Sequence, residues 1–285
     1  MNHDLTQLLE SVVHTKCDEI LIIGTRGLSF MVNEYFKDPR VKILYAPHPL
    51  NAKRNVAMKE AKGDIIAFVD DDAVVCPGWL EALHEGFLSD RVGIVTGPSL
   101  LPPNASLWQR TAQLAMASSP YSQRRYNTFQ EGLVDWHNVI GANFAFRKSA
   151  LSVAGECPEE FLAQGDDMAM AHNVASKGWS VYYSPRASVF HPPHSFWKQV
   201  VQIHRFGRAA KRLKRAGIVH PKRDIAYYFF VPVLVLFSLS YLLGEIKETL
   251  LKDSDIKAKA YICNMLQCMA KQLKACARSL SARRQ

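Results

Sequence analysis

The sequence lacks the cysteine patterns of disulfide-rich and zinc-binding proteins. Its six cysteines are scattered, with no C-x-x-C pair and no cluster with histidine at zinc-ligand spacing. Because isolated cysteines are typical of reducing compartments, we expect reduced thiols in the cytoplasm. The first ten residues also lack the apolar core of a signal peptide, so nothing there indicates export.

Acidic residues are scarce in the last third of the chain. Residues 196–285 hold 5 acidic and 18 basic side chains, whereas residues 1–195 hold 21 acidic and 17 basic ones. The positive charge of the last third favours an anionic partner, either membrane headgroups or nucleic acid. No nucleic-acid recognition motif accompanies it, so we expect a membrane surface rather than nucleic acid.

Apolar residues are plentiful and follow a pattern. They make up 48% of the 285 residues, too many for a disordered chain. Four short runs rich in Ile and Val alternate with helical segments such as Asn51–Ala61, and these runs are Glu19–Gly24, Val41–Ala46, Asp64–Val69 and Val92–Gly97. This alternation predicts an α/β fold with a largely parallel sheet, in which ligands bind beyond the carboxyl ends of the strands.

Three consecutive carboxylates, Asp70, Asp71 and Asp72, follow the third of these runs. On composition alone, a solvated charged turn accounts for them equally well. Their place after a buried strand and before the helix-start signal Pro77–Trp79 favours a binding site. Carboxylate oxygens are ligands that Mg²⁺ and Mn²⁺ prefer, and phosphate oxygens can complete the shell. The sequence therefore predicts an Mn²⁺ or Mg²⁺ site that binds a diphosphate.

Four ordered segments resemble the GT-A glycosyltransferases of the family 2 type. They are Ala52–Asn55, Gly63–Asp72, Ile140–Arg147 and Gly165–Ala171, within a similarity that spans about residues 5–215. The resemblance implies an α/β GT-A fold, with a mostly parallel sheet flanked by helices. It also implies an inverting enzyme that moves a sugar from a nucleotide-diphosphate donor to a lipid-linked or cell-envelope glycan acceptor.

The resemblance assigns a divalent metal to a D-x-D motif, here Asp70 and Asp72. Asp72 is expected to be the main metal ligand, Asp70 would reach the ribose of the donor or share the metal, and Asp71 would lie beside the donor or shape the turn. Some members of the superfamily add a histidine near the position of His191, which follows the apolar run Val181–Phe190. A hydrogen-bonded loop histidine is the alternative for His191.

Five further residues are expected at the donor by the same resemblance. Arg54 would face the nucleotide phosphates, with a solvated helix charge as the alternative. Gly141 and Asn143 belong to a small-residue loop that frames donor and acceptor. Arg205 and Arg208 lie three residues apart on one helical face, where they would close over the diphosphate or face lipid headgroups.

The pair Asp166-Asp167 matches the E-D motif of the family, with Asp in place of the usual Glu. The resemblance makes Asp167 the base that takes a proton from the acceptor hydroxyl. Asp166 would bind the acceptor or cap the helix Met168–Lys177, and capping alone is the structural alternative for both. Asn55 is expected to pack or to bond the backbone rather than to bind a ligand.

The chain departs from the family pattern near its start. Family members begin with a strand that ends in a P-T-Y-N-like motif, and their second strand ends in acidic residues that bind the nucleotide base. Here Glu19–Gly24 is followed by Thr25 and Arg26, so the first strand and the acid are expected to be missing. Three accounts are open: the true start lies further upstream, the nucleotide base is bound differently, or the protein has lost turnover and kept the fold. The last account makes a catalytically inactive, membrane-associated binding protein the alternative function. A metal phosphohydrolase would need further histidine ligands near Asp72.

Ile225–Leu243 is an uncharged stretch of 19 residues. As a helix it would be about 28 Å long, close to the hydrocarbon thickness of a bilayer. Basic residues flank the stretch on both sides, so a single transmembrane crossing would place one basic flank on the wrong side under the positive-inside rule. An in-plane helix, a re-entrant helix and a buried helix of a soluble domain are the alternatives. We expect a GT-A domain at residues 1–215 on the cytoplasmic side of the cell membrane, followed by a membrane segment and a basic amphipathic tail within residues 216–285.

Overall fold

The computed structural model of the protein describes residues 3–24, 37–47, 50–107, 109–110, 113, 130–157, 165–192, 196–218, 243 and 246. The chain divides into two compact units, Met1–Ser195 and Phe196–Gln285. The division falls before helix α9 (Phe196–Arg215), whereas the sequence predicted a boundary after residue 215. Thr25, Arg26 and all of the stretch 225–243 except Leu243 lie outside the described residues.

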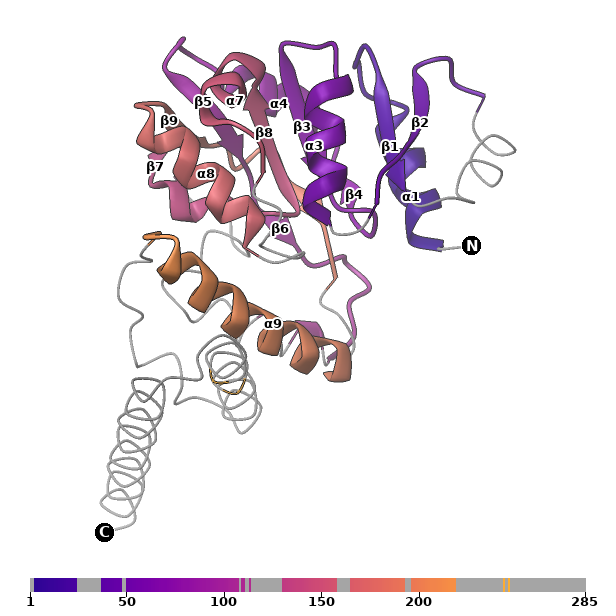
Figure 1. The fold of residues 1–285 in the computed structure, drawn as a ribbon. Coiled ribbons are helices and arrows are strands. Elements are labelled where there is room, and N and C mark those ends of the chain that lie inside the picture. The colour runs from indigo at the N-terminus through magenta and orange to yellow at the C-terminus, as the bar shows by residue number, and fades with distance from the viewer. Residues whose placement is uncertain are drawn as a thin grey trace, which may run out of the picture. The chain divides into compact units, whose positions relative to one another are not determined.

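The largest sheet of the first unit has five strands (Figure 1). Their order is β3 (Ile65–Val69), β8 (Asn143–Arg147), β5 (Val92–Thr96), β9 (Ser180–Tyr183) and β7 (Gly132–Val134). Only β5 and β9 pair in parallel, and the other three pairs are antiparallel. The prediction of a mostly parallel sheet is wrong here, because β8 inserts in the opposite direction between β3 and β5, and local patterns do not reveal which distant strands pair.

Helices cover both faces of this sheet. Strand β8 alternates in the usual way, so Phe144 and Phe146 point to one face and Ala145 to the other. The two phenylalanines pack with residues of α7 (Lys148–Ala154) and α8 (Asp166–Ser176), whereas Ala145 packs with α4 (Trp79–Glu85). Burying each phenylalanine contributes about 1.5–3 kcal/mol, so this alternation holds the strand in place.

Strands β1 (Ile20–Gly24) and β2 (Val41–Tyr45) form a parallel sheet of their own. Within the described part of the chain, neither pairs with a strand of the five-stranded sheet. Helix α1 (His3–Val12) packs against both regions, because Leu9 joins the β1 cluster while Leu8 joins the core beside α4. Helix α3 (Leu50–Glu60) also contacts β1.

A third, small sheet joins β4 (Val74–Val75), β10 (Val189–Phe190) and β6 (Ser99–Leu100). Strand β10 is antiparallel to β4 and parallel to β6. The run Val181–Phe190, predicted as one strand, is therefore divided between β9 and β10, which belong to different sheets. The four other predicted strands and the helix at Asn51–Ala61 are confirmed to within one residue at each end.

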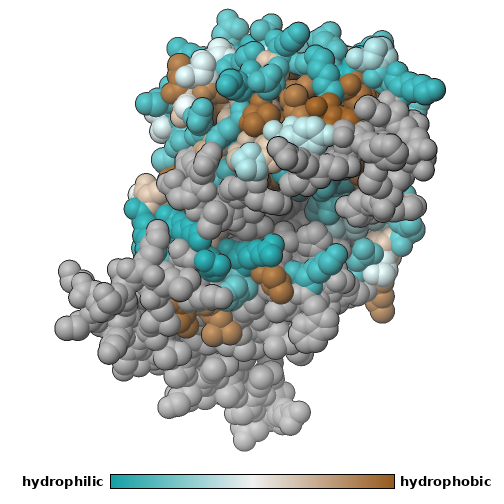
Figure 2. Space-filling model, turned by 45° about the vertical axis from the view of Figure 1, so that its right-hand side comes forward, coloured by the Kyte–Doolittle hydropathy of each residue, from teal (hydrophilic) through white to brown (hydrophobic). Residues whose placement is uncertain are grey.

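On the face drawn in Figure 2, hydrophilic side chains predominate and apolar ones gather in a few patches. Among the described residues, no helix has both the length and the hydropathy needed to cross a bilayer.

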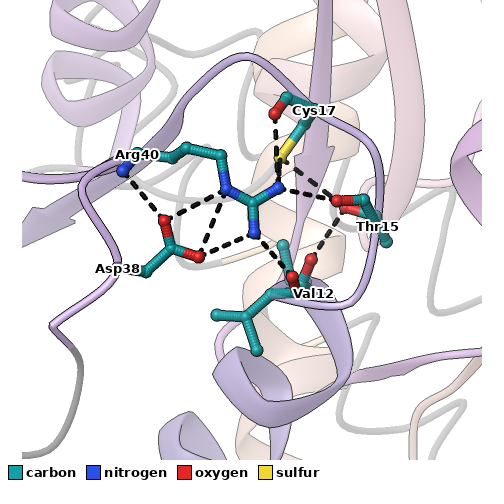
Figure 3. A network of polar contacts seen from close by, with 6 residues as sticks. Val12, Thr15, Cys17, Asp38 and Arg40 are labelled. Atoms are coloured by element: carbon teal, nitrogen blue, oxygen red, sulfur yellow. Dashed lines mark hydrogen bonds and ion pairs between the residues drawn. The ribbon is translucent and has the colours of Figure 1, made fainter.

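Arg40 ties the end of α1 to the start of β2 (Figure 3). Its guanidinium donates to the backbone carbonyls of Val13 at 2.6 Å, Thr15 at 2.7 Å and Cys17 at 3.3 Å. It also pairs with Asp38 at 2.6 Å, and this bond lowers the pKa of the Asp38 carboxyl below its ordinary value. A cation is favourable here because these carbonyls follow the C-terminus of α1, where the helix dipole places partial negative charge.

Replacing Arg40→Met should lower the midpoint of thermal unfolding at pH 7 by a few degrees, because three carbonyls lose a donor and Asp38 loses its partner. The carboxylate contributes stability above its unfolded pKa of about 4, and that part is lost as the pH falls. Circular dichroism measures the midpoint. Lys37→Met removes the same charge from an exposed residue, and equal midpoints for the two variants would contradict the role of Arg40.

Candidate functional site

The aspartate triplet forms a tight turn at the carboxyl end of β3. The backbone N–H of Ala73 donates to the carbonyl of Asp70 at 3.1 Å, which closes the turn. Asp71 is exposed at its tip, whereas Asp70 and Asp72 are half-buried. The turn therefore separates Asp71 from the two residues of the D-x-D pattern.

His191 joins Asp70 and Asp72 through the small sheet. Phe190 of β10 lies opposite Val74 of β4, so the next residue, His191, comes beside the aspartate turn. Its Nε2 atom lies 2.9 Å from Asp72 Oδ1 and 3.7 Å from Asp70 Oδ2. One ligand atom from each residue lies within 4.8 Å of the others. Two carboxylates and an imidazole suit Mn²⁺, so the three residues predicted as metal ligands fit such an ion.

The second acidic cluster begins helix α8. Gly165 precedes it with φ of 82°, a left-handed conformation that favours glycine. Asp166 and Asp167 follow in the first turn, where the helix dipole stabilises negative charge. Asp167 Oδ1 accepts a hydrogen bond from the backbone N–H of Met168 at 2.9 Å. Neither aspartate is the N-cap residue, and only Asp167 keeps substantial exposure, since Asp166 is 3% exposed.

Gly141 lies directly against Asp167. A methyl group added at Gly141 would collide with Oδ2 of Asp167 and lie 3.0 Å from its Cγ, so glycine leaves room for the carboxylate in its present orientation. The next residue, Ala142, accepts a backbone hydrogen bond from Asp70 at 3.4 Å. The aspartate turn and the Asp166-Asp167 pair therefore flank the same short loop, at the end of β3 and the start of β8.

Arg54 of α3 lies among these acids. Its guanidinium forms a buried ion pair with Asp166 and donates to the Gly141 carbonyl at 3.2 Å. In the structure this side chain is directed toward the acidic pair, and its predicted contact with the nucleotide phosphates stays a prediction.

The charges of the acidic pair and Arg54 act on one another. Burial alone would lower the pKa of Arg54, but Asp166, Asp167 and Asp70 raise it, so the side chain stays charged. Burial raises the pKa of Asp166, and the charge of Asp167 adds to this, while Arg54 opposes both. Three carboxylates thus favour the charged form of Arg54.

The side chain of Asn143 is directed into the protein interior, and the predicted place of this residue in the loop that frames the donor stays a prediction. Asn143 is 0% exposed. Its Oδ1 accepts from Trp79 Nε1 at 2.8 Å, and its Nδ2 donates to the carbonyls of Pro98 at 3.1 Å and Ala187 at 2.7 Å. The amide is thus occupied in joining β8 to α4 and to the segments beside β6 and β10.

Thr96 is a supporting residue that the sequence analysis missed. Its hydroxyl donates to the carbonyl of Asn143 at 2.8 Å and accepts from the N–H of Ile140 at 3.2 Å. It therefore fixes both sides of the Gly141-Ala142 loop. The sequence signal for this role was a single hydroxyl-bearing residue at the end of β5, a strand that is otherwise apolar and buried.

Three other expectations have different outcomes. Asn55 bonds the backbone of Cys157, as predicted. Arg205 is exposed and Arg208 is half-buried on α9, in the second unit, so their predicted contact with a diphosphate stays a prediction. The predicted contact of Asp71 with the donor also stays a prediction.

Two characterised relatives resemble part of the chain. The succinoglycan biosynthesis protein ExoM of Rhizobium meliloti (strain 1021) is 25% identical over 182 residues, which are 62% of this chain and 54% of ExoM. The pre-mycofactocin glycosyltransferase of Mycobacterium tuberculosis is 27% identical over 158 residues, 53% of this chain and 32% of that protein. The chain thus spans about half or less of the length of these relatives.

Solved structures share the fold. One is the mannosyltransferase PcManGT from Pyrobaculum calidifontis, solved with GDP-Man and Mn²⁺. Its TM-score is 0.57 at 14% sequence identity, and the match covers 94% of this chain and 77% of the PcManGT chain. Residues 1–349 of TarS from S. aureus have a TM-score of 0.53 at 13% identity and cover 90% of this chain and 73% of that one. The first unit therefore has the α/β GT-A fold expected from the resemblance.

The family profile described as glycosyl transferase family 2 matches residues 2–154, more than half of the chain. This span contains α3, the aspartate turn and the Gly141 loop. The chain belongs to glycosyltransferase family 2.

Proposed function

We propose that the protein is an inverting glycosyltransferase, which transfers a sugar from a nucleotide-diphosphate donor to a glycan or lipid-linked acceptor. One observation carries this proposal: Asp70 bonds Ala142, and the adjacent Gly141 lies against Asp167. A single donor molecule bound at the aspartate turn would therefore lie close to the acidic side chains at the start of α8, one of which serves as the base.

Asp167 is the base. It is the more accessible of the two acids at the start of α8, and the approach to it is lined by the small residue Gly141. As the acceptor oxygen attacks the anomeric carbon, its proton passes to the Asp167 carboxylate. The bond between the anomeric carbon and the diphosphate oxygen breaks on the opposite face, and the nucleoside diphosphate leaves with the electron pair.

Asp70, Asp72 and His191 would hold Mn²⁺ or Mg²⁺. The bound cation would supply positive charge beside the departing diphosphate, on which negative charge develops. The PcManGT structure contains both GDP-Man and Mn²⁺, which supports a nucleotide sugar and a metal for this chain. The relation to ExoM, a protein of succinoglycan biosynthesis, supports a glycan acceptor.

Metal binding can be tested without a substrate. Asp72→Asn and His191→Ala should each weaken Mn²⁺ binding at least tenfold, because each removes one of three ligands. Isothermal titration calorimetry with Mn²⁺ alone measures the affinity. Asp64→Asn is the matched control, since Asp64 is an exposed aspartate before the opposite end of β3. Equal affinities for wild type, Asp72→Asn and His191→Ala would disprove this metal site.

Transfer is tested with Mn²⁺ and a panel of UDP-, GDP- and dTDP-sugars, by following release of the nucleoside diphosphate. Asp167→Asn should lower kcat about 10²- to 10⁴-fold, as expected for loss of a general base, and leave nucleoside diphosphate affinity unchanged. Asp90→Asn, an exposed carboxylate, is the control. If the wild type binds a nucleotide but turns over no donor, the inactive binding protein is supported instead. Absence of both binding and turnover would overturn both functions.

The proposed place of action is the cytoplasmic face of the cell membrane. Helix α9 contains no acidic residue, and Lys198, Val201 and Arg205 are exposed at helical spacings of three and four. Each Lys or Arg near an anionic lipid surface contributes about 1 kcal/mol. The excess of basic residues in 196–285 supports the same partner.

Vesicle flotation tests this localisation with the full chain. Binding should be stronger to vesicles with 30% phosphatidylglycerol than to pure phosphatidylcholine vesicles. The expected difference in binding free energy is about 1 kcal/mol for each Lys or Arg near the surface. Lys198→Glu/Arg205→Glu should reduce it several-fold. The control, Lys59→Glu/Lys177→Glu, makes the same charge change at exposed sites of the first unit. Equal binding of both double variants, or no preference for anionic vesicles, would argue against a membrane role for α9.

A further inference from the structure

Two consecutive residues of α3 reach toward the segment that leads into the acidic pair. Asn55 forms two hydrogen bonds with the backbone of Cys157, one from its Nδ2 to the carbonyl at 3.1 Å and one to its Oδ1 from the N–H at 2.8 Å. Arg54 pairs with Asp166, nine residues further along the chain. One dipeptide thus fixes the chain before and after residues 158–164.

The Arg54 side chain is directed inward. Arg54 is 7% exposed, and its guanidinium carbon lies 5.3 Å from the centroid of the Phe144 ring. One terminal nitrogen pairs with Asp166 and the other donates to the Gly141 carbonyl. Gly141 is also the residue against which the Asp167 carboxylate packs. Arg54 therefore contacts both neighbours of Asp167. One is Asp166, the preceding residue on α8, and the other is Gly141, in the loop that lies against the Asp167 carboxylate.

We infer that Arg54 and Asn55 are positioning residues, which hold Asp166 and the start of α8 so that Asp167 lies against Gly141. Neither residue contacts the donor or the acceptor. This inference rests on the proposed function, in which Asp167 is the base, and adds the residues that orient it.

Physical considerations favour positioning over stability for the buried pair. Removing two charges from water costs about as much as their attraction returns, so a buried ion pair is seldom kept for stability alone. Orientation is a stronger requirement, since a shift of about 1 Å in a reacting group can cost about 100-fold in rate. The planar guanidinium bonds two partners at once, which the ammonium group of lysine does not reproduce.

The competing role for Arg54 is direct binding of the diphosphate. A ligand of the diphosphate raises the affinity for nucleoside diphosphate, whereas a positioning residue affects turnover alone. The experiment therefore measures both quantities on the full chain. It uses UDP and GDP with Mn²⁺ for binding, and the best donor of the sugar panel for turnover.

Arg54→Lys and Asn55→Leu should lower kcat about 100-fold and about 10-fold respectively, and leave nucleoside diphosphate affinity within about threefold of wild type. Lys59→Met, an exposed lysine on the same helix, is the control and should change nothing. A loss of nucleoside diphosphate affinity that matches the loss of turnover would overturn the inference.

Urea unfolding supplies a test that needs no turnover. Arg54→Met leaves Asp166 buried without its partner, so the double variant Arg54→Met/Asp166→Asn should be less destabilised than the sum of the two single variants. If the effects are coupled but the wild type transfers no sugar, only the proposed function fails. If the effects are additive, the pairing and this inference fail.

Discussion

The register between β3 and β8 is the constraint on which the site depends. Val69 lies opposite Asn143, so Asp70 comes next to the Gly141-Ala142 loop. A shift of one residue would turn Phe144 and Phe146 from the face covered by α7 and α8 to the face covered by α4. Apolar packing in the core thereby sets the position of polar groups at the edge of the sheet.

Negative charge is concentrated at this edge, and the fold balances it in two ways. Arg54 is buried beside Asp166 and interacts with Asp167 and Asp70. The remaining charge, on Asp70 and Asp72, faces His191 in an arrangement that fits a divalent cation. Carboxylates this close repel one another, so the arrangement costs stability. A divalent cation, as proposed above for this site, would offset that cost.

Separate parts of the fold bring the components of the site together. The five-stranded sheet aligns the aspartate turn with the Gly141 loop, whereas the small β4-β10-β6 sheet brings His191 from a distant part of the chain. Helix α3 then joins the loop to α8 through Arg54. The buried amide of Asn143 and the hydroxyl of Thr96 hold the loop from inside. The supporting residues are thus polar groups whose partners are mostly backbone atoms.

The sequence by itself was sufficient to predict the α/β class, four strands, the α3 helix and the aspartate turn, because these depend on local periodicity and on the chemistry of neighbouring side chains. The resemblance to the family added the Asp166-Asp167 pair. It also indicated His191, which the small sheet places beside Asp72. Only the tertiary structure decided that β8 runs antiparallel between β3 and β5, that Arg54 faces Asp166, and that Asn143 is fully buried. The physical reason is that strand pairing and buried hydrogen bonds join residues far apart in the chain, and a side chain such as Arg54 has the same local signature whether its partner is phosphate or carboxylate.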